Sequence, residues 1–530
     1  MSSRPQDSTM TQKRFVDMAL RNSVNDTLKN FENMMLEHVD EPPTTKDIEK
    51  FVGENFVSIG ELEEAALKDF KDEPKIIKEI EDPVVRKFAL AIHSIWPSLA
   101  RKMSHHVQEH PEQHSLIPVP NTFIIPGGRF KEFYYWDTYW IVKGLLLSDM
   151  LETARGMVEN LLTMVERFGF VPNGGRIYYL NRSQPPVLTL IMWDYVKVSQ
   201  DYEFLQKYLH VLDKEMDFWL TKRLVQVTHE GVTYNLAHYD SESDTPRPES
   251  YIEDLETCAQ LAHLGEDHLY ECYTDLKSGA ESGWDFSSRW LFAKDGSLSM
   301  DLKDISTRRN VPADLNAFLY KAFHILSKFC KILHQEERAE HWEKYANEWQ
   351  EAINKVLYNE EDGVWYDYDL KLEKHRRYYF ASNLTPLWAG AVNPEDKARI
   401  GGRCAEYLLK QGIRDLRGGV PMSMYPSGQQ WDYPNAWSPY QNLVIIGLHK
   451  SNNETAQELA KELAHKWVNS NVKAYHENKV MFEKYSAAQA GQFGGGGEYQ
   501  IQSGFGWSNG CVLELIHWYF RSKTRKYQRW

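Results

Sequence analysis

The chain has 530 residues, of which 42% are hydrophobic, and its formal net charge is −14. This length allows a large buried core, and the acidic balance argues against a nucleic-acid partner, because phosphates require a basic surface. No apolar run reaches the roughly eighteen residues of a membrane span, and the first residues lack the apolar stretch of a signal peptide. We therefore expect a soluble protein, cytoplasmic as the chain stands or extracellular if a signal peptide has been removed.

The chain predicts one large domain with an N-terminal extension. Residues 1–60 are rich in charge, and no Gly/Ser-rich, Pro-rich or single-charge linker interrupts the interior. We expect residues 1–60 to pack as an extension on a single catalytic domain, residues 61–530. We further expect a monomer or a weak homo-oligomer, with no nucleic-acid partner and no membrane segment.

Apolar residues recur mostly at helical spacing. Residues 316–333 and 342–356 predict two antiparallel helices. Similar pairs are predicted at 137–168, 184–223, 248–280, 383–412 and 435–474, with a last helix near 505–521. Strand-like alternation is short, with its clearest run at residues 363–369, so a parallel sheet is not expected. Because each hairpin alone exposes one apolar face, the fold class is predicted to be all-α, an (α/α)6 toroid with functional loops on one rim.

Five segments combine glycine or proline with aromatic and ionisable residues. They are residues 126–139, 176–186, 282–290, 430–437 and 494–499. Aromatic faces cover the C–H face of a pyranose, while Arg and carboxylate groups match its hydroxyls with strong hydrogen bonds. One such segment alone would favour an aromatic core beside a turn. Five of them indicate loops that project from one rim and bind a sugar.

Cleavage of a glycosidic bond needs one carboxylic acid and one carboxylate on opposite sides of the sugar. Asp285 is the predicted acid, because Trp284 and Phe286 would desolvate it and raise its pKa. The alternative is that Asp285 caps a helix that begins near Ser287.

Glu483 is the predicted base, because the neighbouring Lys484 would help to keep it ionised. The alternative is an ordinary solvated Glu–Lys pair. Glu498, which follows four glycines, is the rival candidate for the base, although that glycine run could equally be a mobile lid.

Neither the cysteines nor the histidines predict a metal site. The five cysteines lack metal-like spacing and are expected to be small core residues: Cys258, Cys272, Cys330, Cys404 and Cys511. Four histidines cluster before Pro118, where a polar loop explains them better than zinc does: His105, His106, His110 and His114. We expect no metal and no cofactor.

Residues 126–139 and 430–441 resemble the two signature motifs of the trehalases, glycoside hydrolase family 37. Further matching segments follow in the family's order: Asn173-Gly174-Gly175-Arg176, Arg182-Ser183-Gln184-Pro185-Pro186, Gly283-Trp284-Asp285 and residues 494–509. The resemblance spans nearly the whole chain. It implies an (α/α)6 barrel that hydrolyses α,α-trehalose to two glucose molecules with inversion at the attacked anomeric carbon.

Carried over residue by residue, the resemblance implies that Asp285 is the general acid and Glu483 the general base. It places eleven further residues in the sugar pocket: Arg129, Trp136, Asp137, Asn173, Arg182, Ser183, Gln184, Arg247, Glu249, Gly283 and Glu498. The N-terminus departs from the family pattern Asp-Ser-Lys-Thr-Phe-Val-Asp-Met, because Asp7-Ser8 and Phe15-Val16-Asp17-Met18 are spaced more widely.

Two other functions fit the same residues. A different toroid glycosidase would act on starch-like or other α-glucosides, and activity on maltose above that on trehalose would select it. A catalytically silent sugar sensor would keep the aromatic cleft and bind trehalose tightly without releasing glucose.

Overall fold

The computed structural model describes residues 12–522, so the Asp7 and Ser8 of the family's N-terminal pattern lie outside the described residues. Within this range, six helices form an inner ring in which each contacts the next and the last contacts the first. They are α8 (Tyr135–Leu147), α10 (Leu188–Ser199), α14 (Ala313–Ile332), α16 (Thr385–Ala389), α18 (Ser438–His449) and α20 (Gly506–Tyr519). The predicted all-α (α/α)6 toroid is therefore confirmed.

An outer ring of amphipathic helices covers the inner one. Its members are α5 (Pro83–His93), α9 (Leu151–Phe168), α11 (Tyr202–Lys222), α15 (Glu336–Ala352), α17 (Lys397–Lys410) and α19 (Glu454–Asn478). The inner helix α8 is enclosed on all sides, since every residue in it except Lys143 is buried. An outer helix such as α9 buries one stripe, including Met157, Leu161 and Val165, and exposes the other.

The inner helices α8 and α20 approach each other closely at two glycines. A Cβ on Gly510 would lie 1.9 Å from the carbonyl oxygen of Trp140, and a Cβ on Gly144 would lie 2.8 Å from the Cα of Gly510. Neither position can accept a side chain without moving a backbone, so these glycines bring the first and last inner helices together and close the ring.

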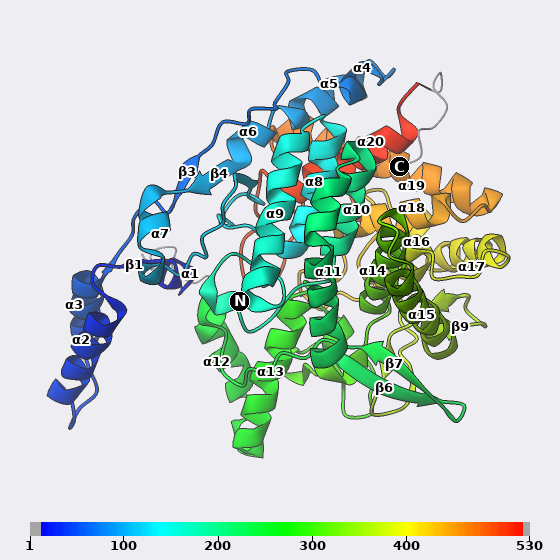
Figure 1. Cartoon of the computed structure of the whole chain (residues 1–530). Helices are drawn as coiled ribbons and strands as arrows, with labels where there is room; N and C mark the ends of the chain where they lie inside the picture. Colours follow the sequence, from blue (N-terminus) through cyan, green and yellow to red (C-terminus); the bar gives the residue numbers. More distant parts are fainter. Residues whose placement is uncertain (1–11, 523–530) are drawn as a thin grey trace.

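One predicted helical pair does not belong to the ring. Residues 248–280 form α12 (Tyr251–Ala259) and α13 (Glu266–Glu281), which contact each other and lie at the rim instead (Figure 1). The outer ring is completed by α5, which packs on α20 and α19 and which the sequence did not single out. Helical periodicity identifies a buried face but not the partner that buries it.

Strands are short and all named pairs within residues 12–522 are antiparallel. The longest hairpin joins β6 (Leu224–His229) to β7 (Val232–Ala237) in the register Leu224↔Ala237. The predicted run at 363–369 is divided into two strands with different partners. β10 (Val364–Trp365) pairs with β9 (Tyr358–Asn359), whereas β11 (Tyr368–Asp369) pairs with both β8 (Asn310–Val311) and β12 (Lys374–His375).

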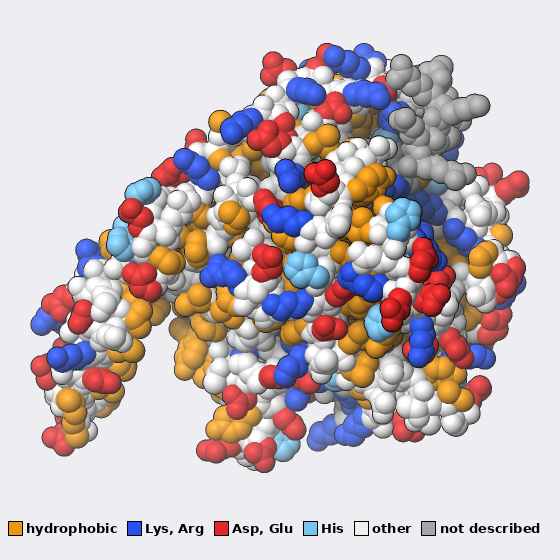
Figure 2. Space-filling view, viewed as in Figure 1, with side chains coloured by type: hydrophobic (Ala, Val, Ile, Leu, Met, Phe, Trp, Pro, Cys, Tyr) orange, Lys and Arg blue, Asp and Glu red, His pale blue; other side chains and the backbone are white. Residues whose placement is uncertain are grey.

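The N-terminal residues divide into a part against the barrel and a part that projects from it. α1 (Gln12–Val16) contacts the short helix η3 (Pro248–Ser250). β1 (Ala19–Leu20) pairs with β2 (Phe56–Val57). Between these strands, α2 (Val24–Glu37) and α3 (Thr45–Asn55) form a hairpin that leans away from the body (Figure 1). In Figure 2 a gap separates this hairpin from the rest of the molecule, and acidic and basic side chains are interspersed over the visible face.

No helix within residues 12–522 combines the length and apolar character required to cross a bilayer.

Two cysteines differ from the prediction. Cys258 on α12 and Cys272 on α13 form a disulfide, so they are not independent core residues. Cys330, Cys404 and Cys511 are free and buried, as predicted. A disulfide between two rim helices could not be read from the sequence, because the spacing of cysteines does not reveal which pair meets.

The histidine cluster is tied to its neighbours by hydrogen bonds. His114 is buried, and its ring nitrogens lie 2.8 Å from His106 Nδ1 and 2.8 Å from Glu61 Oε1. In the described part of the chain, no three His, Cys, Asp or Glu side chains gather as they would around a metal ion.

Candidate active site

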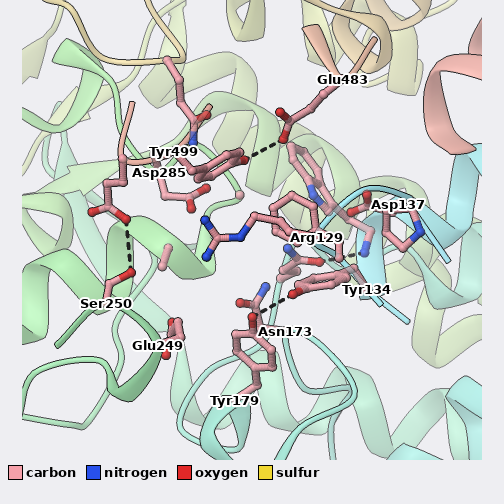
Figure 3. A pocket seen from close by; sticks show the side chains of 18 of the residues that line it. Arg129, Tyr134, Asp137, Asn173, Tyr179, Glu249, Ser250, Asp285, Glu483 and Tyr499 are labelled. Carbon is pink, nitrogen blue, oxygen red and sulfur yellow. Dashed lines mark hydrogen bonds between the residues drawn. The ribbon is translucent and has the colours of Figure 1, made fainter. Parts of the chain in front are cut away.

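A cavity of about 220 Å³ lies where the N-terminal ends of α8, α18 and α20 meet the loops of one rim. Ten of the eleven predicted sugar-binding residues line it, together with Asp285 and Glu483. The ten are Arg129, Trp136, Asp137, Asn173, Arg182, Gln184, Arg247, Glu249, Gly283 and Glu498. Residues far apart in sequence therefore share one pocket (Figure 3).

Ser183 does not belong to this lining. Its backbone N–H donates to Glu281 Oε1 at 2.9 Å, and its hydroxyl donates to the carbonyl of Val171 at 2.6 Å. The side chain is fully buried. Ser183 thus holds the chain between Arg182 and Gln184 from behind, because its hydroxyl is occupied by the backbone and does not reach the cavity.

Tryptophans form the rigid part of the pocket. Trp431 and Trp437 stack with ring centroids 4.0 Å apart and planes 2° apart, and Trp507 meets both of them edge-on. Trp136 packs 5.6 Å from Trp431 and 5.6 Å from Trp507. These rings support each other, so they offer a fixed apolar surface of the kind that covers a sugar ring.

Asp285 follows the end of α13 and is held by its backbone. Its carbonyl accepts a hydrogen bond from Gln430 Nε2, and the next carbonyl, of Phe286, accepts one from the Trp431 N–H at 3.1 Å. Gly283 permits the approach: it has φ +75°, and a Cβ there would lie 2.5 Å from the Trp136 ring. The helix-capping alternative does not hold, because Ser287 caps the short helix η5 (Ser288–Trp290).

The environment of Asp285 raises the pKa of its carboxyl to about 7. Burial is the largest cause, and the charge of Glu498 acts in the same direction, whereas the positive charge of Arg247 opposes it. A carboxyl group with this pKa keeps its proton through the acidic range and releases it near neutrality, as a general acid must.

Glu483 is 2% exposed and precedes β14 (Lys484–Ser486), which pairs with β13 (Asn435–Trp437). Tyr499 donates its hydroxyl to Glu483 Oε1 at 2.6 Å, and the N–H of Gln502 donates to Oε2 at 3.4 Å. Burial raises the pKa of Glu483, and the charge of Lys484 together with these hydrogen bonds opposes the rise. The net shift of its pKa is upward, although the hydrogen bonds from Tyr499 and Gln502 favour the ionised form.

Arg129 packs against Tyr499 and Gln502, the two residues that donate hydrogen bonds to Glu483. Its guanidinium carbon is 5.0 Å from the centre of the Tyr499 ring, and its backbone N–H donates to Gln502 Oε1 at 2.8 Å. Figure 3 shows Arg129, Asp285, Glu483 and Tyr499 around the same cavity. A cation at this place can hold sugar hydroxyls while it favours ionisation of Glu483.

Two further arginines are clamped by carboxylates. Arg182 donates to Asn173 Oδ1 at 3.1 Å and to Glu249 Oε1 at 2.6 Å. Arg247 forms two parallel contacts with Asp254 and also donates to Glu498 Oε1 at 2.9 Å. Each guanidinium is therefore oriented before any ligand arrives, which lowers the entropy cost of binding.

Asp137, in the first turn of α8, is buried and lines the same cavity. Burial raises its pKa well above the ordinary value, and the negative charges of Glu483 and Asp285 add to the rise. Its carboxyl group therefore keeps its proton to higher pH than an exposed Asp does, and in the protonated form it can donate a hydrogen bond to a sugar hydroxyl.

Several lining residues were not predicted as site residues. They are Lys13, Pro126, Phe130, Tyr134, Tyr179, Ser250, Glu253, Ala280, Gln430, Trp431, Trp437, Tyr499, Phe505 and Trp507. Many lie in the five aromatic segments, so a reading of whole segments would have included them. Lys13 stands where the family's N-terminal pattern has its Lys, two residues before Phe15, but no role was carried over to it.

A closed double ring of helices with a polar pocket, two buried carboxyl groups and several oriented arginines defines a glycoside hydrolase of the toroid type. Comparison with known proteins gives the family. The model of the family described as Trehalase matches residues 8–519, and the chain belongs to this family.

Relatives match over almost the full chain. The chain is 49% identical to a trehalase of Tenebrio molitor over 508 residues, which are 96% of this chain and 91% of the relative. It is 44% identical to a trehalase of Homo sapiens over 508 residues, 96% of this chain and 86% of the relative. Among solved structures, neutral trehalase Nth1 from Saccharomyces cerevisiae has the same fold, with a TM-score of 0.59, 24% identity, and coverage of 74% of this chain and 73% of that one.

Proposed function

We propose that this protein hydrolyses α,α-trehalose to two glucose molecules with inversion, and that Asp285 is the general acid and Glu483 the general base. The observation that carries the proposal is the unequal environment of two carboxyl groups in one cavity. Asp285 has a pKa of about 7, whereas Glu483 accepts hydrogen bonds from Tyr499 and Gln502. Acid and base catalysis requires that such a pair share one proton, which the acid holds and the base lacks.

The reaction follows from these positions. Glu483 accepts a proton from a water molecule, and the oxygen of that water attacks one anomeric carbon. The bond from this carbon to the bridging oxygen breaks, and Asp285 gives its proton to the departing oxygen. Inversion needs room for the water, so the two carboxyl groups should lie about 6.5–9.5 Å apart on either side of the bond.

The remaining predicted residues would bind the two glucose rings. Tryptophan faces such as Trp136 cover the C–H faces, while Arg129, Arg182 and Arg247 donate to hydroxyls. Asp137 in its protonated form adds a neutral donor among charged groups. We propose that the reaction requires no cofactor, because both proton transfers are assigned to protein carboxyl groups.

We further propose that residues 61–530 form one catalytic domain, with the N-terminal extension packed on it in part, and that the protein acts as a monomer or weak homo-oligomer. The Cys258–Cys272 disulfide supports an oxidising compartment. Of the two locations left open by the sequence, we therefore propose the extracellular one.

The test is incubation of the purified protein with trehalose, with an anomer-resolved NMR spectrum of the first products. Inversion releases one β-glucose from the attacked carbon and one α-glucose from the other ring. Two α-glucose molecules would contradict the inverting mechanism. Faster hydrolysis of maltose would select another α-glucosidase, and tight binding of trehalose without glucose would select a sensor.

A further inference from the structure

We propose that Lys13, on the N-terminal helix α1, is a positioning residue of the active site, which acts through Glu132 and two tyrosines on the sugar-binding Arg182. The inference rests on the proposed function and adds a residue from outside the barrel to it. The resemblance assigned no role to Lys13, although this residue stands where the family's N-terminal pattern has its Lys. Lys13 lies 119 residues before its partner Glu132.

Lys13 is 6% exposed and lines the cavity, although most of the N-terminal extension lies away from the barrel. Its Nζ donates to Glu132 Oε1 at 2.5 Å and to the Tyr178 hydroxyl at 3.0 Å, and it lies 3.3 Å from Asp17 Oδ2. All three ammonium protons therefore have oxygen atoms nearby. Because its ammonium group already contacts three protein oxygen atoms, we expect Lys13 to hold neighbouring side chains in place and not to bind the sugar directly.

Glu132 is the group that requires this lysine. Its side chain is completely buried, and burial alone would raise its pKa, but the charges of Lys13 and Arg176 lower the pKa to about 2. Arg176 is the weaker partner, with Nε 3.6 Å from Glu132 Oε2. Removal of Lys13 would leave a buried carboxylate poorly compensated, which is among the costlier changes in a protein interior.

The carboxylate of Glu132 fixes two tyrosines in the pocket wall. The Tyr134 hydroxyl donates to Glu132 Oε1 at 2.6 Å, and it lies 2.8 Å from the Tyr179 hydroxyl. Both tyrosines line the cavity. Figure 3 shows this pair below Arg129 with their hydroxyl groups pointing toward one another.

Tyr179 carries the connection to the arginine. Its ring lies 5.0 Å from the guanidinium carbon of Arg182, which then donates to Asn173 and Glu249. A second contact works in the same direction, because α1 packs on η3, the helix that contains Glu249. Lys13 is thus linked to Arg182 by two routes, one through Glu132 and the tyrosines and the other through the contact of α1 with the helix that carries Glu249.

Other groups complete the charge balance around Lys13. Asp17 accepts from the Tyr178 hydroxyl at 2.8 Å and lies 3.3 Å from Arg176 Nε, while Arg176 Nη2 lies 2.8 Å from Glu61 Oε2. Two cations, Lys13 and Arg176, therefore face three carboxylates in a mostly buried cluster, so a neutral side chain at position 13 would leave Arg176 alone to offset them.

The first experiment compares K13M with K29M, which removes an exposed lysine from the projecting helix α2. We expect K13M to lower kcat/KM for trehalose by about 10–100-fold, mainly through KM, because displacement of a binding group by about 1 Å costs on this order. K29M should behave as the wild type. Binding of trehalose, measured by calorimetry, should weaken in K13M by a similar factor.

The second experiment adds E132Q and the double variant K13M/E132Q. Removal of both charges leaves no unpaired carboxylate, so the double variant should recover part of the affinity and thermal stability that K13M loses. This recovery also keeps the inference testable if K13M folds poorly.

An unchanged KM and affinity in folded K13M, even with a lower melting temperature, would overturn the inference and leave Lys13 a purely structural residue. The proposed function fails separately, if the wild type itself releases no glucose from trehalose. Should the wild type bind trehalose without hydrolysis, calorimetry on the same variants still decides the role of Lys13.

Discussion

The pocket has two walls that are built differently. One wall stands on the inner helices and consists mainly of aromatic rings, such as Trp136 on α8 and Trp507 on α20. The other consists of rim loops and carries most of the charge, including Asp285, Arg247 and Glu498. The helix wall is fixed by ring stacking, whereas the loop wall is held by ion pairs between loops, such as Arg247 with Glu498 at 2.9 Å.

The difference indicates that the helix wall sets the shape of the pocket and the loop wall supplies its ionisable groups. Helices packed in a ring hold their side chains in place through many buried neighbours, so they can define the outline of a sugar. Loops are held by fewer contacts, but they bring together ionisable groups that are distant in sequence. We therefore expect changes in the loop wall to affect catalysis most, and three predictions test this.

The largest effect is expected from the two carboxyl groups. D285N and E483Q should each lower kcat for trehalose by about 10²–10⁴-fold, because each removes one proton-transfer group. Circular dichroism should show that both variants remain folded.

D295N, which changes an exposed carboxylate outside the pocket, is the matched control and should retain activity. Near-normal turnover in D285N or E483Q would show that this residue does not transfer a proton in the reaction. It would also contradict the view that the loop wall carries the catalytic groups.

A smaller effect is expected from Asp254, which touches Arg247 but does not line the cavity. D254N should weaken the paired contact with Arg247 and lower kcat/KM by about 10–100-fold, chiefly by raising KM, since the guanidinium loses its fixed direction. Steady-state kinetics measure this split.

D301N, at an exposed position, serves as the control for D254N. A fall in kcat with constant KM would contradict the role of Asp254 in orienting a binding group and would indicate that the loop wall acts on the reacting bond directly.

The third prediction concerns pH and has the mildest effect. As the proposed general acid, Asp285 would have to be protonated to act, and its pKa is about 7. We therefore expect kcat/KM to fall as pH rises through 7, by about tenfold for each further unit. A pH profile of kcat/KM measures this alkaline limb.

The same group links pH to stability. The folded-state pKa of Asp285 is raised above its ordinary value of 3.8, so its contribution to stability is present at low pH and is lost as pH rises through about 7. D285N should therefore melt higher than the wild type at pH 8 and not at pH 4. An equal difference in melting temperature at pH 8 and pH 4 would show that folding does not raise the pKa of Asp285.

Much of the fold could be predicted from the sequence because each hairpin has a periodic apolar face. The error at residues 248–280 has a physical reason: α12 and α13 are amphipathic, but they bury their faces at the rim. Likewise, α5 has the same apolar periodicity as other helices, but only the folded structure shows that it packs against α20 and completes the outer ring.

The site was predicted where the signal was local. Gly283 and Asp285 lie in one short segment with aromatic neighbours, so their chemistry could be inferred. Asp254 lies in an ordinary charged segment, and Lys13 lies in the N-terminal pattern to which no role was assigned. The roles proposed for them come from contacts with Glu132 and Arg247 that exist only in the folded chain. Ser183 shows the opposite case, since a residue inside a matching motif turns its hydroxyl to the backbone.

The disulfide between Cys258 and Cys272 has a practical consequence for anyone who produces this protein. Asp254 lies one helical turn before Cys258 on α12, so the bond tethers the helix that carries the partner of Arg247. Material from a host with a reducing cytosol lacks that tether, and its apparent affinity for sugar then describes a looser rim than the one drawn here. We therefore expect the measured affinity for sugar to depend on whether the Cys258–Cys272 disulfide has formed.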